Sequence, residues 1–182
     1  MAKAQGRTVG IVTNAQITDP APAAFYAHTA NATDRQSIAA QLVDNARIDV
    51  VLGGGSRSFL PDGDAGSRKD GRDLLAELQR KGCEIIRTKA DLENAETYRD
   101  QGIVGMFAPG SMAYSDEIES GSQQPSLSDM VRRAIEFLQV NSRGYLLIVD
   151  AGLVTEAAER NLSQRPNPIS PFRCSLPLQG FT

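Results

Sequence analysis

Two aspartates stand at the carboxyl ends of predicted strands, where carboxylates can bind a metal ion. Asp19 follows the first apolar run by a short loop, and Asp150 closes the last one. Ligands of open α/β sheets gather at this end of the strands, and Mg²⁺ prefers carboxylate oxygens. A helix cap or a loop hydrogen bond explains an isolated aspartate at a strand end equally well. The pair therefore predicts a magnesium-type site, with a structural role as the alternative.

His28 is the only histidine of the chain, so a multi-histidine zinc site cannot be built from these residues alone. Its setting, AAFYAHTAN, is typical of the end of a short helix, and a histidine that satisfies a carbonyl is the simpler interpretation. The catalytic alternative is a metal-independent ester hydrolase, with Ser56 or Ser111 as the nucleophile and His28 as the base. That chemistry requires hydrogen-bond contact between nucleophile and base.

A glycine-rich run, LGGGSRSF at residues 52–59, follows a predicted strand. It could present backbone N–H groups to an anion, or Ser56 to a substrate. The run is not a P-loop, because it lacks the Gly-Lys-Ser/Thr ending. It is not a nucleophile elbow either, because Ser58 stands where that motif needs glycine. A tight glycine turn leaving the strand is the better interpretation.

The elements that must position these residues alternate along the chain. Strand-length apolar runs are separated mostly by helix-like stretches, which indicates βα units and an α/β fold with a mainly parallel sheet sandwiched by helices. The apolar runs are residues 8–13, 49–52, 83–87, 103–108 and 145–150.

Three helices have terminal signals. Thr33 and Gln36 match a capping box, and a second helix is predicted from about Asp73 to Gly82. The clearest helix spans residues 126–141, where apolar residues recur at helical spacing.

Two long segments rich in turn residues, 53–71 and 109–125, are predicted to be surface loops. From about Ser163 onward, repeated prolines interrupt any periodicity. We therefore predict one α/β domain over residues 1–162 and an irregular tail over 163–182.

The bulk composition excludes several classes of protein. The 182 residues carry a formal charge of −3, and no block of Lys and Arg is present to bind a nucleic acid. No membrane span or signal peptide is recognisable, which predicts a cytoplasmic chain as written. Cys83 and Cys174 lie far apart and are expected to be plain thiols.

Four segments together resemble the alkaline phosphatase family: residues 10–31, 49–61, 66–75 and 125–152, in the family's order and approximate spacing. The resemblance extends over about residues 6–161. It implies an incomplete alkaline-phosphatase-like fold and a metal-dependent hydrolase of phosphate monoesters. Members use two zinc ions and a magnesium around a serine nucleophile. The family is commonly exported, so a missing natural start would imply a periplasmic or secreted protein.

By this resemblance, most of the family's catalytic and metal-binding residues up to position 32 are absent from this chain. The nucleophilic serine lies upstream of the segment that the chain matches. Asp19 falls on a magnesium-side position and is retained. Ala21 replaces a metal-binding threonine, and Ala32 replaces the arginine that grips phosphate bidentately.

The metal-binding positions near the end of the matched segment are altered as well. Asp150 stands where the family has a magnesium-binding glutamate, one methylene longer. Thr155 and Glu159 occupy the places of a zinc-binding aspartate and histidine, although Glu159 could still offer an oxygen. The resemblance therefore implies an impaired or inactive phosphatase. The alternative is a noncatalytic fragment that associates with itself or a partner through exposed sheet edges.

Overall fold

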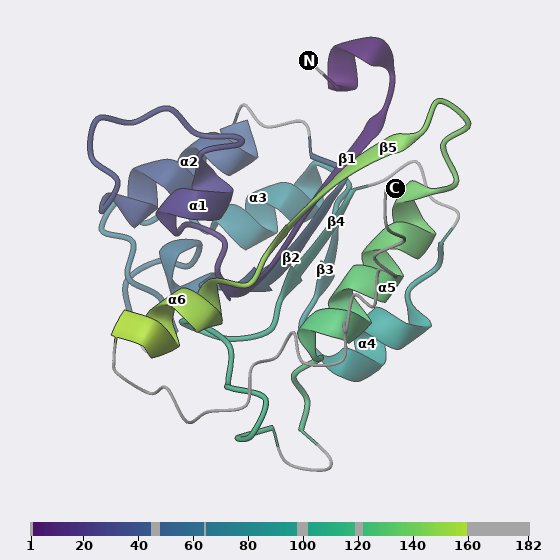
Figure 1. Ribbon diagram of the computed structural model, residues 1–182. Helices are drawn as coiled ribbons and strands as arrows, with labels where there is room; N and C mark the ends of the chain where they lie inside the picture. Colours follow the sequence, from purple (N-terminus) through teal and green to yellow (C-terminus); the bar gives the residue numbers. More distant parts are fainter. Residues whose placement is uncertain (1, 45–47, 64, 98–101, 119–121, 160–182) are drawn as a thin grey trace, which may run out of the picture.

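The protein contains one five-stranded parallel sheet with strand order β3-β4-β2-β1-β5. Figure 1 shows the computed structural model, which describes residues 2–44, 48–63, 65–97, 102–118 and 122–159. The predicted tail over 163–182 and Cys174 lie outside the described residues. The strands are β1 (Thr8–Gln16), β2 (Val50–Gly54), β3 (Glu84–Ile86), β4 (Ile103–Met106) and β5 (Tyr145–Asp150).

Helices cover both faces of the sheet, as predicted (Figure 1). One face carries α1, α2 and α3, and the other carries α4 and α5. Short 3-10 turns, η1 and η2, flank the first two strands. The helical elements are η1 (Lys3–Gln5), α1 (Pro20–Ala23), α2 (Arg35–Asp44), η2 (Ser56–Ser58), α3 (Leu74–Arg80), α4 (Lys89–Asn94), α5 (Leu127–Leu138) and α6 (Gly152–Glu159).

Two apolar cores lie between the sheet and its helices. Val50 and Leu52 of β2 pack with α4 and α5, whereas Val51 between them packs with α2 and α3. Successive side chains of a strand point to opposite faces, so a strand covered on both faces is apolar throughout. This double burial explains why the strands read as continuous apolar runs.

Two of the predicted helix starts are confirmed and one is wrong. Ser126 and Asp129 form the capping box of α5, and Asp73 caps α3. The predicted Thr33 cap does not form, because Asp34 accepts the backbone N–H of Ser37 at 3.1 Å instead. A carboxylate one residue later competes for the same helix end, and α2 therefore begins at Arg35.

The predicted surface loop over residues 53–71 is instead partly packed into the protein. Gly53 and Gly54 belong to the buried strand β2, and the chain then turns at Gly55, which has a φ of 97°. The tight glycine turn is thereby confirmed. Phe59 is fully buried, and the side chain of Arg68 is 2% exposed.

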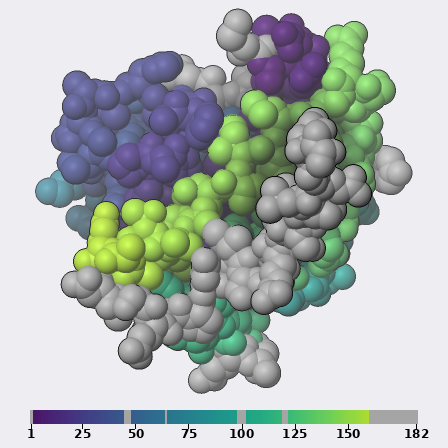
Figure 2. All heavy atoms as spheres, in the orientation of Figure 1, coloured from purple at the N-terminus to yellow at the C-terminus, as the bar shows by residue number. Residues whose placement is uncertain are grey.

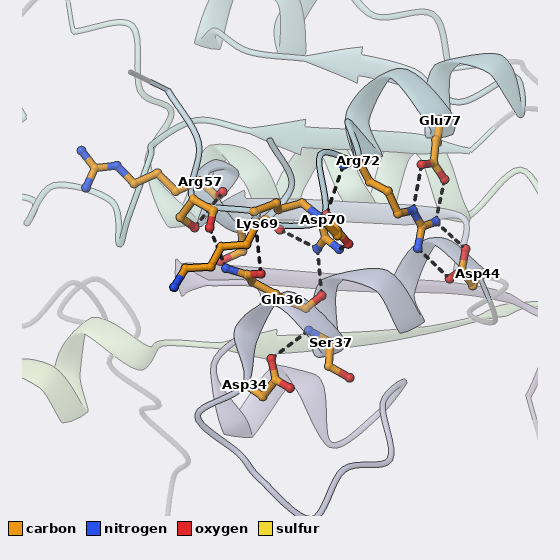
Figure 3. Close-up of polar contacts among 12 residues, drawn as sticks. Asp34, Gln36, Ser37, Asp44, Arg57, Lys69, Asp70, Arg72 and Glu77 are labelled. Atoms are coloured by element: carbon orange, nitrogen blue, oxygen red, sulfur yellow. Dashed lines mark hydrogen bonds and ion pairs between the residues drawn. The ribbon is translucent and has the colours of Figure 1, made fainter. Parts of the chain in front are cut away.

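Arg68 crosslinks the packed loop to α2, and Figure 3 shows two of its partners, Gln36 and Asp70. Its Nη1 donates to the carbonyls of Gln36 and Ser58, at 2.8 and 3.1 Å, and its guanidinium forms an ion pair with Asp70. The hydrogen bond from Arg68 lowers the pKa of the Asp70 carboxyl. This network holds the segment after β2 against the N-terminal half of α2.

Strand β5 lies at one edge of the sheet and pairs only with β1 among the described strands. Its side chains are less covered than those of the central strands. Leu146 is 44% exposed and Val149 is 46% exposed. None of the described helices has the length and hydropathy needed to cross a bilayer.

Candidate functional site

Polar side chains meet where β1 and β5 end. Thr13 lies directly opposite Asp150 in the parallel register, and its hydroxyl donates to Asp150 Oδ2 at 2.7 Å. On the next residue, Asn14 Oδ1 accepts the backbone N–H of Leu153 at 3.1 Å. Asn14 thus fixes the start of α6 beside β1. Neither Thr13 nor Asn14 stood out in the sequence, because their partners are more than 130 residues away.

Asp19 lies in the turn between β1 and α1, and its carboxylate is already engaged. Arg35 Nη2 donates to Asp19 Oδ1 at 2.7 Å, and the backbone N–H of Gln16 donates to Asp19 Oδ2 at 3.1 Å. The side chain makes no cap bond to α1. The nearby hydroxyl of Tyr26 donates to the carbonyl of Ile17, and burial together with the charge of Asp19 raises its pKa.

The described residues do not form a complete metal centre. They contain no group of three or more His, Cys, Asp or Glu side chains arranged to hold a metal ion. Asp19 and Asp150 have different hydrogen-bond partners. Glu159 is exposed at the last residue of α6, and Thr155 is exposed on the same helix. A two-zinc set therefore does not fit these residues.

The structure places His28 in the exposed connection between α1 and α2. Its backbone N–H donates to Gln41 Oε1, and its carbonyl accepts from Gln41 Nε2. Ser56 opens the η2 turn, and Ser111 follows β4 in a bend. No hydrogen bond between the described residues joins His28 to either serine, and the geometry of an acyl-transfer pair is not formed.

A hollow of about 430 Å³ opens near the carboxyl ends of β1 and β2. Gln16, the last residue of β1, lines it together with the first turn of α2 and the turn after β2. Two arginines, Arg35 and Arg57, contribute to its wall. The glycine-rich run predicts an anion contact through backbone groups or Ser56, whereas the residues of that run that line the hollow are Arg57 and Ser58. The contribution of Arg35 could not be foreseen, because it comes from another element.

These features define an open α/β scaffold, with polar residues gathered at the carboxyl ends of a parallel sheet. The chain belongs to the alkaline phosphatase family, because the family model described as alkaline phosphatase matches residues 1–165. The resemblance drawn from the sequence is thereby confirmed.

Relatives and solved structures agree with this assignment. Alkaline phosphatase 4 of Bacillus subtilis is 34% identical over 165 residues, covering 88% of this chain and 33% of the relative. The tissue-nonspecific isozyme of alkaline phosphatase from Gallus gallus is also 34% identical, covering 84% of this chain and 35% of the relative. The crystal structure of Thermus thermophilus alkaline phosphatase superposes with a TM-score of 0.77 at 34% identity, covering 88% of this chain and 32% of that one. The chain spans about a third of the length of these relatives.

Proposed function

We propose that this chain carries part of the scaffold of a metal-dependent phosphate monoester hydrolase and does not itself hydrolyse phosphate monoesters. The observation that carries the proposal is the state of Asp19: its carboxylate is bound by Arg35 and does not belong to a three-residue metal cluster within the described residues. Ala21 and Ala32 add to the argument, because neither side chain can bind a metal or grip a phosphate. Asp19 and Asp150 remain as a weak magnesium-type site.

The expected result of a phosphatase assay is no turnover above background. Each missing electrostatic stabiliser typically lowers the rate by about 10²–10³-fold, so several losses together leave no useful catalysis. The measurement is release of a chromogenic phenol from its phosphate monoester by the purified chain, with added zinc and magnesium.

The matched control is the variant Asp150→Asn, purified in the same way. Background from a contaminating phosphatase would be equal in both preparations. Metal-dependent turnover that is present in the wild type and lost in Asp150→Asn would contradict the proposal.

The outer edge of β5 favours a second candidate function, a noncatalytic module that associates with another copy. Among the described residues no further strand pairs with this edge, and exposed Leu146 and Val149 lie along it. We expect the chain to form dimers or larger species at roughly 10–100 μM, a range typical of modest apolar contacts. Sedimentation velocity across a concentration series measures this.

The variant Val149→Lys should shift the population toward monomer, because a lysine on an edge strand opposes pairing. Val140→Lys is the control. Val140 is similarly exposed but lies in the connection before β5. A wild-type chain that stays monomeric throughout the series would exclude this second function.

A further inference from the structure

The connection between α1 and α2 contains the sequence Asn31-Ala32-Thr33. An asparagine followed two residues later by threonine or serine, with any residue except proline between them, is the acceptor pattern for N-linked sugars. Asn161 begins the other match in the sequence and lies outside the described residues. Short patterns of this kind also occur by chance, so the surroundings of Asn31 decide whether a sugar can be attached there.

The acceptor asparagine lies on the surface of the protein. Every residue from His28 to Arg35 is exposed. Figure 2 shows the purple and blue atoms of α1, α2 and their connection at the upper left of the visible surface. Thr29 and Ala32, on either side of Asn31, line a second hollow of about 400 Å³. A sugar attached to Asn31 therefore has room beside the chain.

The side chain of Asn31 is oriented by Thr33. Asn31 Oδ1 accepts the backbone N–H of Thr33 at 3.0 Å and the hydroxyl of Thr33 at 2.7 Å. Because a backbone N–H donates to this atom, it is the oxygen of the amide, and the nitrogen Nδ2 points to the other side. Nδ2 makes no hydrogen bond to any of the described residues. The nitrogen that would carry a sugar is therefore available.

The other hydrogen bonds around Asn31 are local. The hydroxyl of Thr29 accepts the N–H of Asn31 at 3.0 Å and donates to its carbonyl at 3.2 Å. The same carbonyl accepts the N–H of Asp34 at 3.2 Å. Each of these bonds joins residues two or three positions apart at the surface, so a transferase can bind this segment without opening either apolar core.

We propose that Asn31 is an acceptor for N-linked glycosylation. The donor is a sugar whose anomeric carbon carries a diphosphate, which is linked either to a nucleoside or to a lipid. In the transfer, a bond forms between Asn31 Nδ2 and the anomeric carbon, and the bond from that carbon to the diphosphate oxygen breaks. The amide nitrogen loses one proton and the diphosphate leaves. The modification does not depend on hydrolysis of phosphate esters by this chain.

The test uses the full chain of 182 residues with Asn161→Gln, which removes the other match. In one reaction, the purified, folded chain is incubated with a soluble asparagine glucosyltransferase and uridine diphosphate glucose. In a parallel reaction, the chain is translated behind a cleavable signal sequence with microsomes, which supply the lipid-linked donor. Fragment mass spectrometry locates any added sugar, and we expect it on Asn31. Modification in only one reaction identifies the donor class, and modification in both identifies an acceptor that either donor can use.

Variants of the acceptor pattern are the controls. Asn31→Asp keeps an oxygen that can accept from Thr33 but has no amide nitrogen, so the modification should be lost. Thr33→Ala should lose it as well, whereas Thr33→Ser keeps a hydroxyl and should retain it. Circular dichroism confirms that each variant keeps the helical content of its parent. A synthetic peptide of residues 27–36, treated in the same way, shows whether folding limits access to Asn31.

The proposal is overturned if neither reaction modifies Asn31 in the full chain, whether or not the peptide is modified. Modification of Thr33→Ala to the same extent as its parent would overturn it too. Because no turnover of a phosphate ester is measured, either outcome leaves the phosphatase assay unaffected.

Discussion

Replacing Arg68 by methionine should lower the free energy of unfolding by about 2–4 kcal/mol, since two carbonyls lose their donor in a buried place. Those carbonyls belong to Gln36 and Ser58. The partner carboxylate of Asp70 is nearly half exposed, so water compensates for most of the lost ion pair. Most of the expected loss therefore comes from the carbonyls and from packing. Urea denaturation followed by circular dichroism measures it.

Arg72→Met is the control for this change. Arg72 bonds Asp44 and Glu77 near the surface and lowers the pKa of both carboxyls through its hydrogen bonds. Such exposed pairs contribute little, and we expect a loss of about 1 kcal/mol or less. Arg68→Lys should fall between the two, because lysine keeps the charge but lacks the fork. Equal losses for Arg68→Met and Arg72→Met would contradict the interpretation.

Arg68 also illustrates why part of the fold could not be predicted from the sequence. The five strands were found because burial on both faces makes each one an apolar run. A buried arginine has no such local signal, since its burial depends on carbonyls that lie 10 and 32 residues away. Residues 53–71 were therefore predicted to be a surface loop on composition alone.

The candidate site could likewise be predicted only in part. Asp19 and Asp150 were placed at the carboxyl ends of strands, because the strand boundaries could be read from hydropathy. Their hydrogen-bond partners, Arg35 and Thr13, come from other elements. Thr13 has no feature that separates it from an ordinary strand residue until β5 is paired beside it. The position of each aspartate along the sheet could be predicted from the sequence. Its hydrogen-bond partner could be found only from the three-dimensional arrangement of the elements.

The second large effect on stability is expected at Gly54, where two chain segments approach each other closely. A Cβ added to Gly54 would lie 2.2 Å from the carbonyl oxygen of Gly110 and 3.1 Å from that of Ala15. Both contacts are backbone atoms, so neither can rotate away. We expect Gly54→Ala to lower the free energy of unfolding by about 2–3 kcal/mol, in the range of overpacked buried sites.

Gly110→Ala separates this steric effect from the general effect of replacing glycine. A Cβ at Gly110 would meet no heavy atom within 4 Å, and the residue is not among the glycines with positive φ. The change should therefore be neutral or slightly stabilising, because alanine restricts the unfolded chain. Thermal unfolding of both variants side by side is the measurement. A large loss in Gly54→Ala alone would establish that the segment after β4 packs against the end of β2, which also forms one wall of the hollow. Similar small changes in both variants would show that the two segments can separate at little cost.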